Sequence, residues 1–436
     1  MTQLLFVNAK QIATCAGPGR ARHGPEMSDA GVTSGSAVAV DGEIIAAVGP
    51  SDRLIHDYPN AELVDCTGRV LTPGLVDSHT HAIFGRARYE EQEMRAAGVG
   101  YMDIARRGGG IHSSVADLRA RSEDELFALA LPRIARLASY GSTTIEVKSG
   151  YGLSLEDELK SLRVIARLSA EVPVRLVPTW LGAHEIPREF RDRDSQRRDY
   201  VRHLIDEMLP QVAAKKLASF ADVFCEPGVF TVAESREILT ASRGAGLSLK
   251  VHADELEPHG GAELAAELGA ISADHLGAIS DGGIAALAGS RTVATLLPGT
   301  MVFLGKEKHA PARRLIDAGA AVSLATDFNP GTSPTFNFPL ILTLGVSQLR
   351  MSVAEAIIAA TVNGAAALGL ADRTGQLAPG YSADLALWEA EDVREIPYWY
   401  GDRRCMSTWA RGKACHALGP SDNLNYTHWP NSTVRG

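Results

Sequence analysis

Apolar runs of strand length alternate with longer stretches of helical period through the middle of the chain. The runs cover residues 70–79, 142–149, 174–184, 220–226, 247–255, 270–275, 292–298 and 320–327. This alternation is typical of βα units around a parallel sheet. Eight strands separated by helices, over roughly 300 residues, predict a (β/α)8 barrel of the TIM type at residues 71–369. A doubly wound open sheet is the competing fold, but no GxGxxG motif follows the first run.

Three serines predict where helices of this region begin. Ser122, Ser154 and Ser352 each precede an apolar-periodic stretch, and an acidic residue follows three positions later. A serine and an acid at that spacing form a capping box, which satisfies the free N–H groups of a first helical turn.

Both ends of the chain have a different texture from the middle. Residues 1–70 contain short strand-like runs broken by Gly, Pro and Asp, and similar runs return at 375–391 and 407–417. Residues 418–436 are polar and are expected to form a loosely attached tail. The two strand-rich ends therefore flank the predicted barrel.

Composition excludes several classes of protein. The 436 residues carry a net charge of −9 and are 45% hydrophobic, as in ordinary globular proteins, and no basic patch suggests a nucleic-acid partner. No apolar run approaches the ~18 residues of a membrane span, and the first residues lack the layout of a signal peptide. The five cysteines are scattered without a CxxC pair, so no disulfide framework is expected. We expect a cytoplasmic protein that acts on a small molecule.

Potential metal ligands lie at the ends of the predicted strands. His79 and His81 end the first strand, where alternate residues share a face and Thr80 turns away. Further candidates end the third, fifth, sixth and eighth strands: His184, His252, His275 and Asp327. Barrel enzymes carry their active sites at this C-terminal end of the strands. The pattern therefore predicts one polar site at the mouth of the barrel.

One metal ion with an open position for water fits these residues. His79, His81, His252 and Asp327 offer three imidazoles and one carboxylate, a set that suits zinc, iron or manganese. Such an ion lowers the pKa of a bound water from ~15.7 toward ~7. Glu255, three residues beyond His252, is the candidate base, and a cation beside it is expected to lower its pKa. His275 or Asp327 are the alternatives for moving the proton.

A second metal ion is not favoured by the sequence. Binuclear barrel hydrolases bridge their ions with a carboxylated lysine or an acid on the fourth strand, and that strand has Cys225 and Glu226 but no lysine. Lys148 lies on the second strand, so we expect it to pair with Glu146 or another carboxylate.

Several loop residues are candidates for contacting a substrate. Arg88 follows the histidine pair and is suited to a carboxylate, and Tyr151 offers a hydroxyl from a glycine-flanked loop. After the last strand come Asn329, the backbone of Gly331, and Thr332. Ordinary turn formation is the alternative explanation for these loop residues.

The HxH pair, the histidines of strands five and six and the aspartate of strand eight resemble the amidohydrolase superfamily. The HxxE of His252 and Glu255 is similar to its cytosine-deaminase-like branch, and residues 363–388 resemble the passage that leads from the barrel into a small β-domain. The resemblance implies that residues 1–70 and 370–417 together form a small β-sandwich domain.

A set of longer motifs narrows the resemblance to the imidazolonepropionase family; these motifs lie at 86–115, 143–153, 181–187, 252–265, 272–276, 296–306 and 324–337. The resemblance implies hydrolysis of the cyclic amide of 4-imidazolone-5-propanoate to N-formimidoyl-L-glutamate in histidine degradation. It also implies one divalent or trivalent ion per chain, zinc or iron, and a homodimer. Metal ligands carry over to His79, His81, His252 and Asp327. Substrate contacts carry over to Arg88, Tyr151, His184, Glu255, Asn329, Gly331 and Thr332.

Two other functions are compatible with parts of the pattern. A nucleobase or amidine deaminase would share the ligands and the HxxE, but it would have less use for Arg88 and Tyr151 and would release ammonia. A barrel that binds metal without catalysis would require a broken set of ligands or base. Here ligands, base and open position are all predicted together.

Overall fold

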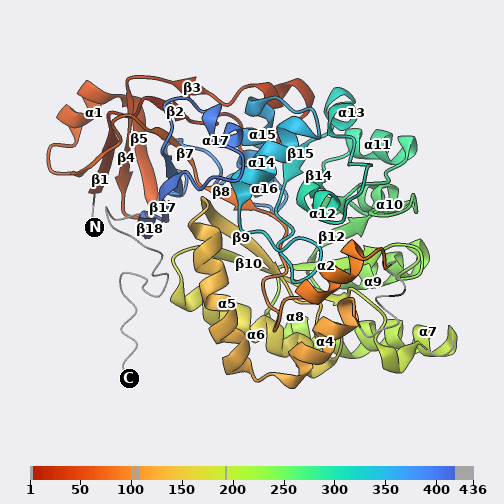
Figure 1. Ribbon diagram of the computed structural model, residues 1–436. Helices are drawn as coiled ribbons and strands as arrows, with labels where there is room; N and C mark the ends of the chain where they lie inside the picture. Colours follow the sequence, from red (N-terminus) through yellow and green to blue (C-terminus); the bar gives the residue numbers. More distant parts are fainter. Residues whose placement is uncertain (1–2, 100–102, 104–108, 192–193, 418–436) are drawn as a thin grey trace.

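Eight parallel strands form a barrel in the middle of the chain, in a computed structural model that describes residues 3–99, 103, 109–191 and 194–417 (Figure 1). Each strand pairs with its neighbours in chain order. The strands are β8 (Leu75–Asp77), β9 (Ser142–Lys148), β10 (Arg175–Ala183), β11 (Phe220–Cys225), β12 (Ser248–Ala253), β13 (Ser272–His275), β14 (Val293–Leu296) and β15 (Val322–Leu324). Each lies within a predicted run, so the predicted barrel is confirmed.

The barrel closes between the segments that follow its first and last strands. Thr80 and Phe328 form a parallel bridge, in which the N–H of His81 donates to the carbonyl of Phe328 at 2.8 Å. The N–H of Asp327 donates to the carbonyl of His79 at 3.0 Å. This seam brings the two histidines of the first strand against the aspartate that follows the eighth.

Helices connect the strands and cover the outside of the barrel (Figure 1). They are α2 (Tyr89–Ala96), α4 (Ile111–Ala120), α5 (Glu123–Ala138), α6 (Leu155–Glu171), α7 (Asp194–Arg202), α8 (Leu209–Lys215), α9 (Val232–Gly244), α10 (Gly261–Leu268), α11 (Asp281–Ala288), α12 (Pro298–Phe303), α13 (Ala312–Asp317), α14 (Phe338–Ser347), α15 (Val353–Ala360) and α16 (Val362–Ala366). Capping boxes at Ser122 and Ser352 begin α5 and α15, as predicted, and the Ser154 side chain accepts from the N–H of Asp157 at the start of α6.

Two small sheets beside the barrel are built from both ends of the chain, shown red and blue in Figure 1. One has the order β5-β4-β1-β6 and the other β18-β17-β16-β7-β2-β3. Their strands are β1 (Gln3–Val7), β2 (Gln11–Ala13), β3 (Val32–Thr33), β4 (Ser36–Asp41), β5 (Ile44–Pro50), β6 (Glu62–Asp65), β7 (Val70–Pro73), β16 (Leu385–Trp388), β17 (Cys405–Ala410) and β18 (Lys413–Ala417). The helix α1 (Ser51–Asp57) packs on β1, β4 and β5, and α17 (Glu395–Tyr398) packs on α14. Phe6 and Val38 of one sheet share an apolar core with Leu71 and Leu385 of the other. The predicted sandwich from both chain ends is confirmed.

The first predicted strand, 70–79, is divided between the two parts of the fold. β7 pairs with β16 and β2 of the small domain, whereas β8 pairs with β9 of the barrel. Gly74 joins them, and the side chain of Thr143 leaves no room for a Cβ at this position. Both halves are buried, so the sequence pattern is continuous across a boundary between sheets. The small sheet reaches Pro73, beyond the boundary expected at residue 70.

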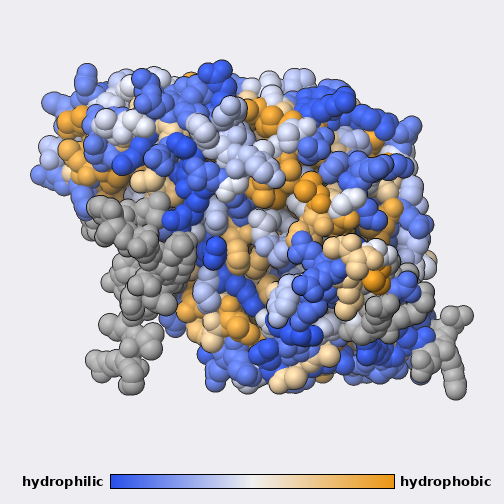
Figure 2. Space-filling view, viewed as in Figure 1, coloured by the Kyte–Doolittle hydropathy of each residue, from blue (hydrophilic) through white to orange (hydrophobic). Residues whose placement is uncertain are grey.

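Hydrophilic residues cover most of the face seen in Figure 2, with hydrophobic patches between them. Among the described helices, none combines the length and the apolar character that crossing a membrane requires. The polar tail expected at 418–436 lies outside the described residues.

Candidate active site

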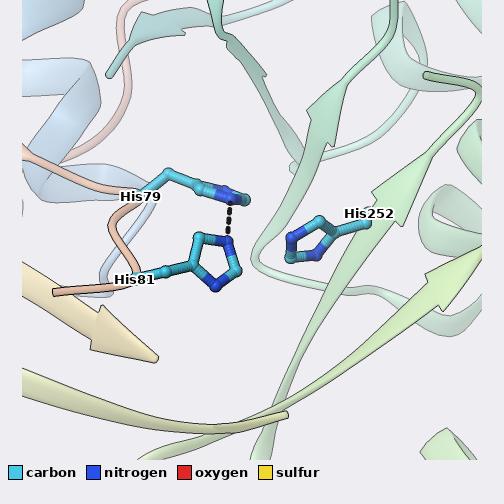
Figure 3. A group of neighbouring side chains, drawn as sticks. All are labelled: His79, His81 and His252. Atoms are coloured by element: carbon cyan, nitrogen blue, oxygen red, sulfur yellow. Dashed lines mark hydrogen bonds between the residues drawn. The ribbon is translucent and has the colours of Figure 1, made fainter. Parts of the chain in front are cut away.

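His79 and His81 turn their rings toward the same point at the mouth of the barrel (Figure 3). Their Nε2 atoms are 3.3 Å apart. Thr80 faces away, and its hydroxyl donates to the carbonyl of Glu146 at 2.6 Å. The alternation of side chains along an extended segment therefore places both imidazoles on one face, as the sequence predicts.

His252 and Asp327 complete this group from other parts of the barrel. Potential ligand atoms of His79, His81 and His252 all lie within 4.8 Å of one another. One oxygen of Asp327, Oδ1, lies 3.6 Å from Nε2 of both His79 and His81. The buried Nε2 of His252 has no hydrogen-bond partner within the described part of the chain. Convergent imidazoles, a carboxylate and an unsatisfied buried nitrogen fit a metal ion.

Two aspartates lie behind these imidazoles, one hydrogen-bonded to its ring and one in close approach. Nδ1 of His79 donates to Oδ2 of Asp274 at 2.7 Å, and Nδ1 of His252 lies 2.9 Å from Oδ2 of Asp222. A carboxylate behind a histidine fixes the ring and leaves Nε2 for the ion. Burial holds the pKa of His79 well below its ordinary value, which favours the neutral form that binds metals. The sequence analysis missed both aspartates, although each lies on a barrel strand.

Lys148 is paired with carboxylates inside the barrel. Its ammonium donates to Glu146 at 2.9 Å and to Asp222 at 2.7 Å, in a fully buried setting. The expected pairing with Glu146 is therefore confirmed.

Glu255 is held over the site by a turn that a second glutamate shapes. The carboxylate of Glu226 accepts the backbone N–H groups of Glu255, Leu256 and Glu257 at 3.0, 3.0 and 2.8 Å. Oε2 of Glu255 then lies 3.6 Å from Nδ1 of His275. Burial, with the charges of Asp327 and Glu226, raises the pKa of Glu255 to about 8. The surroundings of Glu255 therefore raise its pKa, whereas the sequence analysis expects a neighbouring cation to lower it.

His275 and Asp327 are directed into the site by their backbone conformations, and Asp327 is also oriented by a hydroxyl group. Both residues have left-handed backbones, with φ of 80° and 50°, which is unfavourable for residues other than glycine and typical of functional sites. The hydroxyl of Thr300 donates to Oδ2 of Asp327 at 2.6 Å, which leaves Oδ1 facing the histidines. The sequence analysis missed Thr300, which lies on α12.

The side chains of Tyr151 and His184 lie beside His81 and line one side of the site. The ring of His184 stacks on His81 with centroids 5.0 Å apart, and the ring of Tyr151 lies 5.4 Å from His184. Nδ1 of His184 donates to the carbonyl of Gly150 at 2.9 Å, and burial lowers the pKa of His184 to about 3. The buried Glu158 holds the same loop by accepting three of its N–H groups, a role that the sequence analysis missed.

Arg88 lies across the loop that follows the eighth strand, against the backbone of Gly331. Only 9% of its side chain is exposed. Its Nε lies 3.4 Å from Oε1 of Glu91, and one terminal nitrogen is 3.5 Å from the hydroxyl of Ser114. Among the described residues this is the one carboxylate contact of Arg88, which leaves the guanidinium with donors for a second anion.

Asn329, Gly331 and Thr332 bond one another in this structure. Oδ1 of Asn329 accepts the N–H groups of Gly331 and Thr332 at 2.9 and 2.8 Å, and its Nδ2 donates to the hydroxyl of Thr332 at 2.9 Å. These hydrogen bonds hold the turn after the eighth strand, and Arg88 lies against the Gly331 of that turn.

Residues 70–415 match the model of the Amidohydrolase family. Imidazolonepropionase of Geobacillus kaustophilus is 46% identical over 95% of this chain and 98% of its own length. Imidazolonepropionase of Symbiobacterium thermophilum is 48% identical over 91% of this chain and 93% of its own. Among solved structures, a zinc-bound adenosine deaminase from Xanthomonas campestris has a TM-score of 0.69 at 17% identity and covers 97% of this chain and 95% of its own, which shows the shared fold.

The barrel fold, with imidazoles and a carboxylate that converge at its mouth, defines this protein as a metal-dependent hydrolase. The chain belongs to the amidohydrolase family and, within it, to the imidazolonepropionases.

Proposed function

We propose that this chain hydrolyses the cyclic amide of 4-imidazolone-5-propanoate to N-formimidoyl-L-glutamate, a step of histidine degradation. The observation that carries the proposal is the group of His79, His81 and His252 within 4.8 Å of one another, with Asp327 3.6 Å from two of them and Glu255 buried near Asp327. Sequence identity of 46% to an imidazolonepropionase over 95% of this chain supports the choice of substrate.

His79, His81, His252 and Asp327 would hold one ion, zinc or iron. When bound, the ion lowers the pKa of a water molecule and polarises the ring carbonyl. Hydrogen bonding supports this assignment, because Asp274 occupies Nδ1 of His79 and Thr300 occupies one oxygen of Asp327. These bonds leave Nε2 of His79 and Oδ1 of Asp327, which are 3.6 Å apart, for the ion.

Glu255 is proposed to take the proton of the attacking water. The oxygen of that water bonds to the ring carbonyl carbon, the carbon–nitrogen bond breaks, and Glu255 returns the proton to the departing nitrogen. Its burial and its place 3.6 Å from His275 support this role. His275 and Asp327 are the alternative carriers of either proton transfer.

Arg88 is proposed to bind the propionate of the substrate. A nearly buried guanidinium with one carboxylate contact can accept a second carboxylate through its remaining donors. Tyr151 and His184 would contact the ring, because their side chains adjoin His81. Asn329, Gly331 and Thr332 would complete the pocket beneath Arg88.

Loss of the imidazolone chromophore in the presence of purified protein tests the activity, with metal analysis of the same sample. Release of N-formimidoyl-L-glutamate without ammonia is expected. Ammonia release from a nucleobase or amidine would instead identify a deaminase. Sedimentation of the same sample tests the homodimer that we propose from the family.

A further inference from the structure

Charged residues fill the barrel interior directly beneath the proposed metal ligands. Glu146, Lys148, Asp222, Lys250 and Asp274 all have fully buried side chains. The interior of a (β/α)8 barrel is usually packed with branched apolar side chains. We name these five residues the ionic layer.

The two lysines connect the carboxylates of the ionic layer. The ammonium of Lys148 lies 2.9 Å from Glu146 and 2.7 Å from Asp222. The ammonium of Lys250 lies 3.1 Å from the other oxygen of Glu146 and 3.5 Å from Asp274. Lys250 also donates to the carbonyl of Ser78 at 2.8 Å.

Two carboxylates of the ionic layer are the ones that hold metal-binding imidazoles. Asp222 contacts Lys148 and Nδ1 of His252, and Asp274 accepts from Nδ1 of His79. Contacts therefore run from each lysine through an aspartate to a histidine, and Lys148 also lies 3.7 Å from Asp274. The bond from Lys250 to Ser78 adds a second hold on the segment that carries His79.

Stability alone does not explain a buried layer of this kind. Burying ion pairs removes charges from water, and well-packed apolar residues of similar volume are often as stabilising or more so. Residues behind a metal ligand, by contrast, typically change metal affinity 10–100-fold when they are replaced. The ionic layer contacts two of the three proposed histidine ligands and is therefore placed to set their orientation.

We propose that Lys148 and Lys250 are positioning residues that act on the metal site through Asp222 and Asp274. Lys148 holds Asp222 so that His252 presents Nε2 to the ion. Lys250 fixes the Ser78 carbonyl and lies beside Asp274, so that His79 also presents its Nε2 to the ion. This inference rests on the proposed ligand set, and no step of the reaction is assigned to either lysine.

The test is a double-mutant cycle on Lys148 and Asp222 with Zn²⁺ affinity as the readout, measured by competition with a chromophoric chelator. We expect Lys148→Met and Asp222→Asn each to weaken Zn²⁺ binding at least about tenfold. Because the contact of Lys148 with Asp222 (2.7 Å) is shorter than its contact with Asp274 (3.7 Å), the loss in the double variant is expected to be closer to that of Asp222→Asn alone than to the product of both losses. The double variant removes one charge of each sign, so it is expected to fold even if Lys148→Met alone does not, and comparing its Zn²⁺ affinity with that of Asp222→Asn then tests the inference.

Lys160→Met is the matched control. Lys160 is also a mostly buried lysine, but its ammonium donates to the carbonyls of Leu118 and Arg121 and pairs with Asp157, away from the barrel interior. This variant is expected to lower the thermal midpoint of the metal-free chain and to leave Zn²⁺ affinity unchanged. The visible spectrum of bound Co²⁺ is expected to shift in Lys148→Met and to stay unchanged in Lys160→Met.

The outcomes separate the inference from the proposed function. Unchanged Zn²⁺ affinity and Co²⁺ spectrum in Lys148→Met, or losses that multiply in the double variant, would overturn the positioning role while the ligand set stands. Failure of the unsubstituted chain to bind Zn²⁺ would overturn the ligand set and the inference together.

Discussion

The guanidinium of Arg88 lies against the backbone of Gly331, in a space that a Cβ on residue 331 would fill. The N–H of Arg88 also donates to the carbonyl of Pro330 at 2.8 Å. The two loops that meet here follow the first and the eighth strands of the barrel, on either side of its seam. Arg88 is thus placed by the closure of the barrel as well as by its own loop.

Arg88→Met is expected to raise KM for the imidazolone substrate with a smaller effect on kcat. Losing a desolvated partner of the propionate costs roughly 2–4 kcal/mol in binding. Gly331→Ala is also expected to raise KM, because the methyl group of the alanine displaces the guanidinium of Arg88. Gly244→Ala is the control, since a Cβ there meets no atom within 4 Å. An unchanged KM in both Arg88→Met and Gly331→Ala would remove Arg88 from the substrate site.

One tightly bound metal ion per chain is expected, and a chelator is expected to abolish activity. Removing the ion should also lower the thermal midpoint, since a ligand at 100 times its Kd stabilises the folded state by ~2.7 kcal/mol. His252→Ala should lose the ion, whereas His203→Ala, on the helical segment between α7 and α8, should keep it. Two equivalents of metal in the active enzyme would contradict a mononuclear site.

Glu255→Gln is expected to keep the metal and the fold but to lower kcat by ~10²–10⁴. The amide preserves the shape of the side chain and cannot accept the proton of the water. KM should change little, because Arg88 supplies the main contact with the propionate. Metal content, kcat and KM measured on one preparation test this. Loss of the ion would make Glu255 a ligand, and a kcat above about a tenth of the original would assign the proton transfer to His275 or Asp327.

The cysteines are expected to resist thiol reagents at pH 8 while the protein is folded. Burial disfavours the charged thiolate, and it raises the pKa of Cys15, Cys66 and Cys415 to about 12 and that of Cys225 to about 11. The pKa of Cys405 is raised in the same way. At pH 8 the reactive form is therefore scarce, and it becomes abundant only as the pH rises toward these values.

A chromogenic disulfide reagent measures this directly. We expect almost no reaction in the folded chain and five thiols in guanidinium chloride, since all five cysteines are free and buried. Rapid reaction of one thiol at pH 8 without denaturant would show that its region opens readily.

Periodicity in the sequence determined the barrel and the common direction of His79 and His81. Each of the eight strands lies within a predicted apolar run, and His79 and His81 share a face because side chains alternate along extended backbone. Capping boxes at Ser122 and Ser352 likewise depend only on residues three apart. These features follow from local backbone geometry, which a few neighbouring residues specify.

Contacts between distant strands were decided by the tertiary structure. Asp274 bonds His79 across 195 positions of the chain, and Asp222 meets His252 from the neighbouring strand because the register pairs Asp222 with Lys250. Register and barrel closure depend on how all the strands pack together, so no local pattern distinguished these aspartates from others on barrel strands. The division of residues 70–79 between two sheets was hidden for the same reason: both halves are buried, and burial makes their patterns alike.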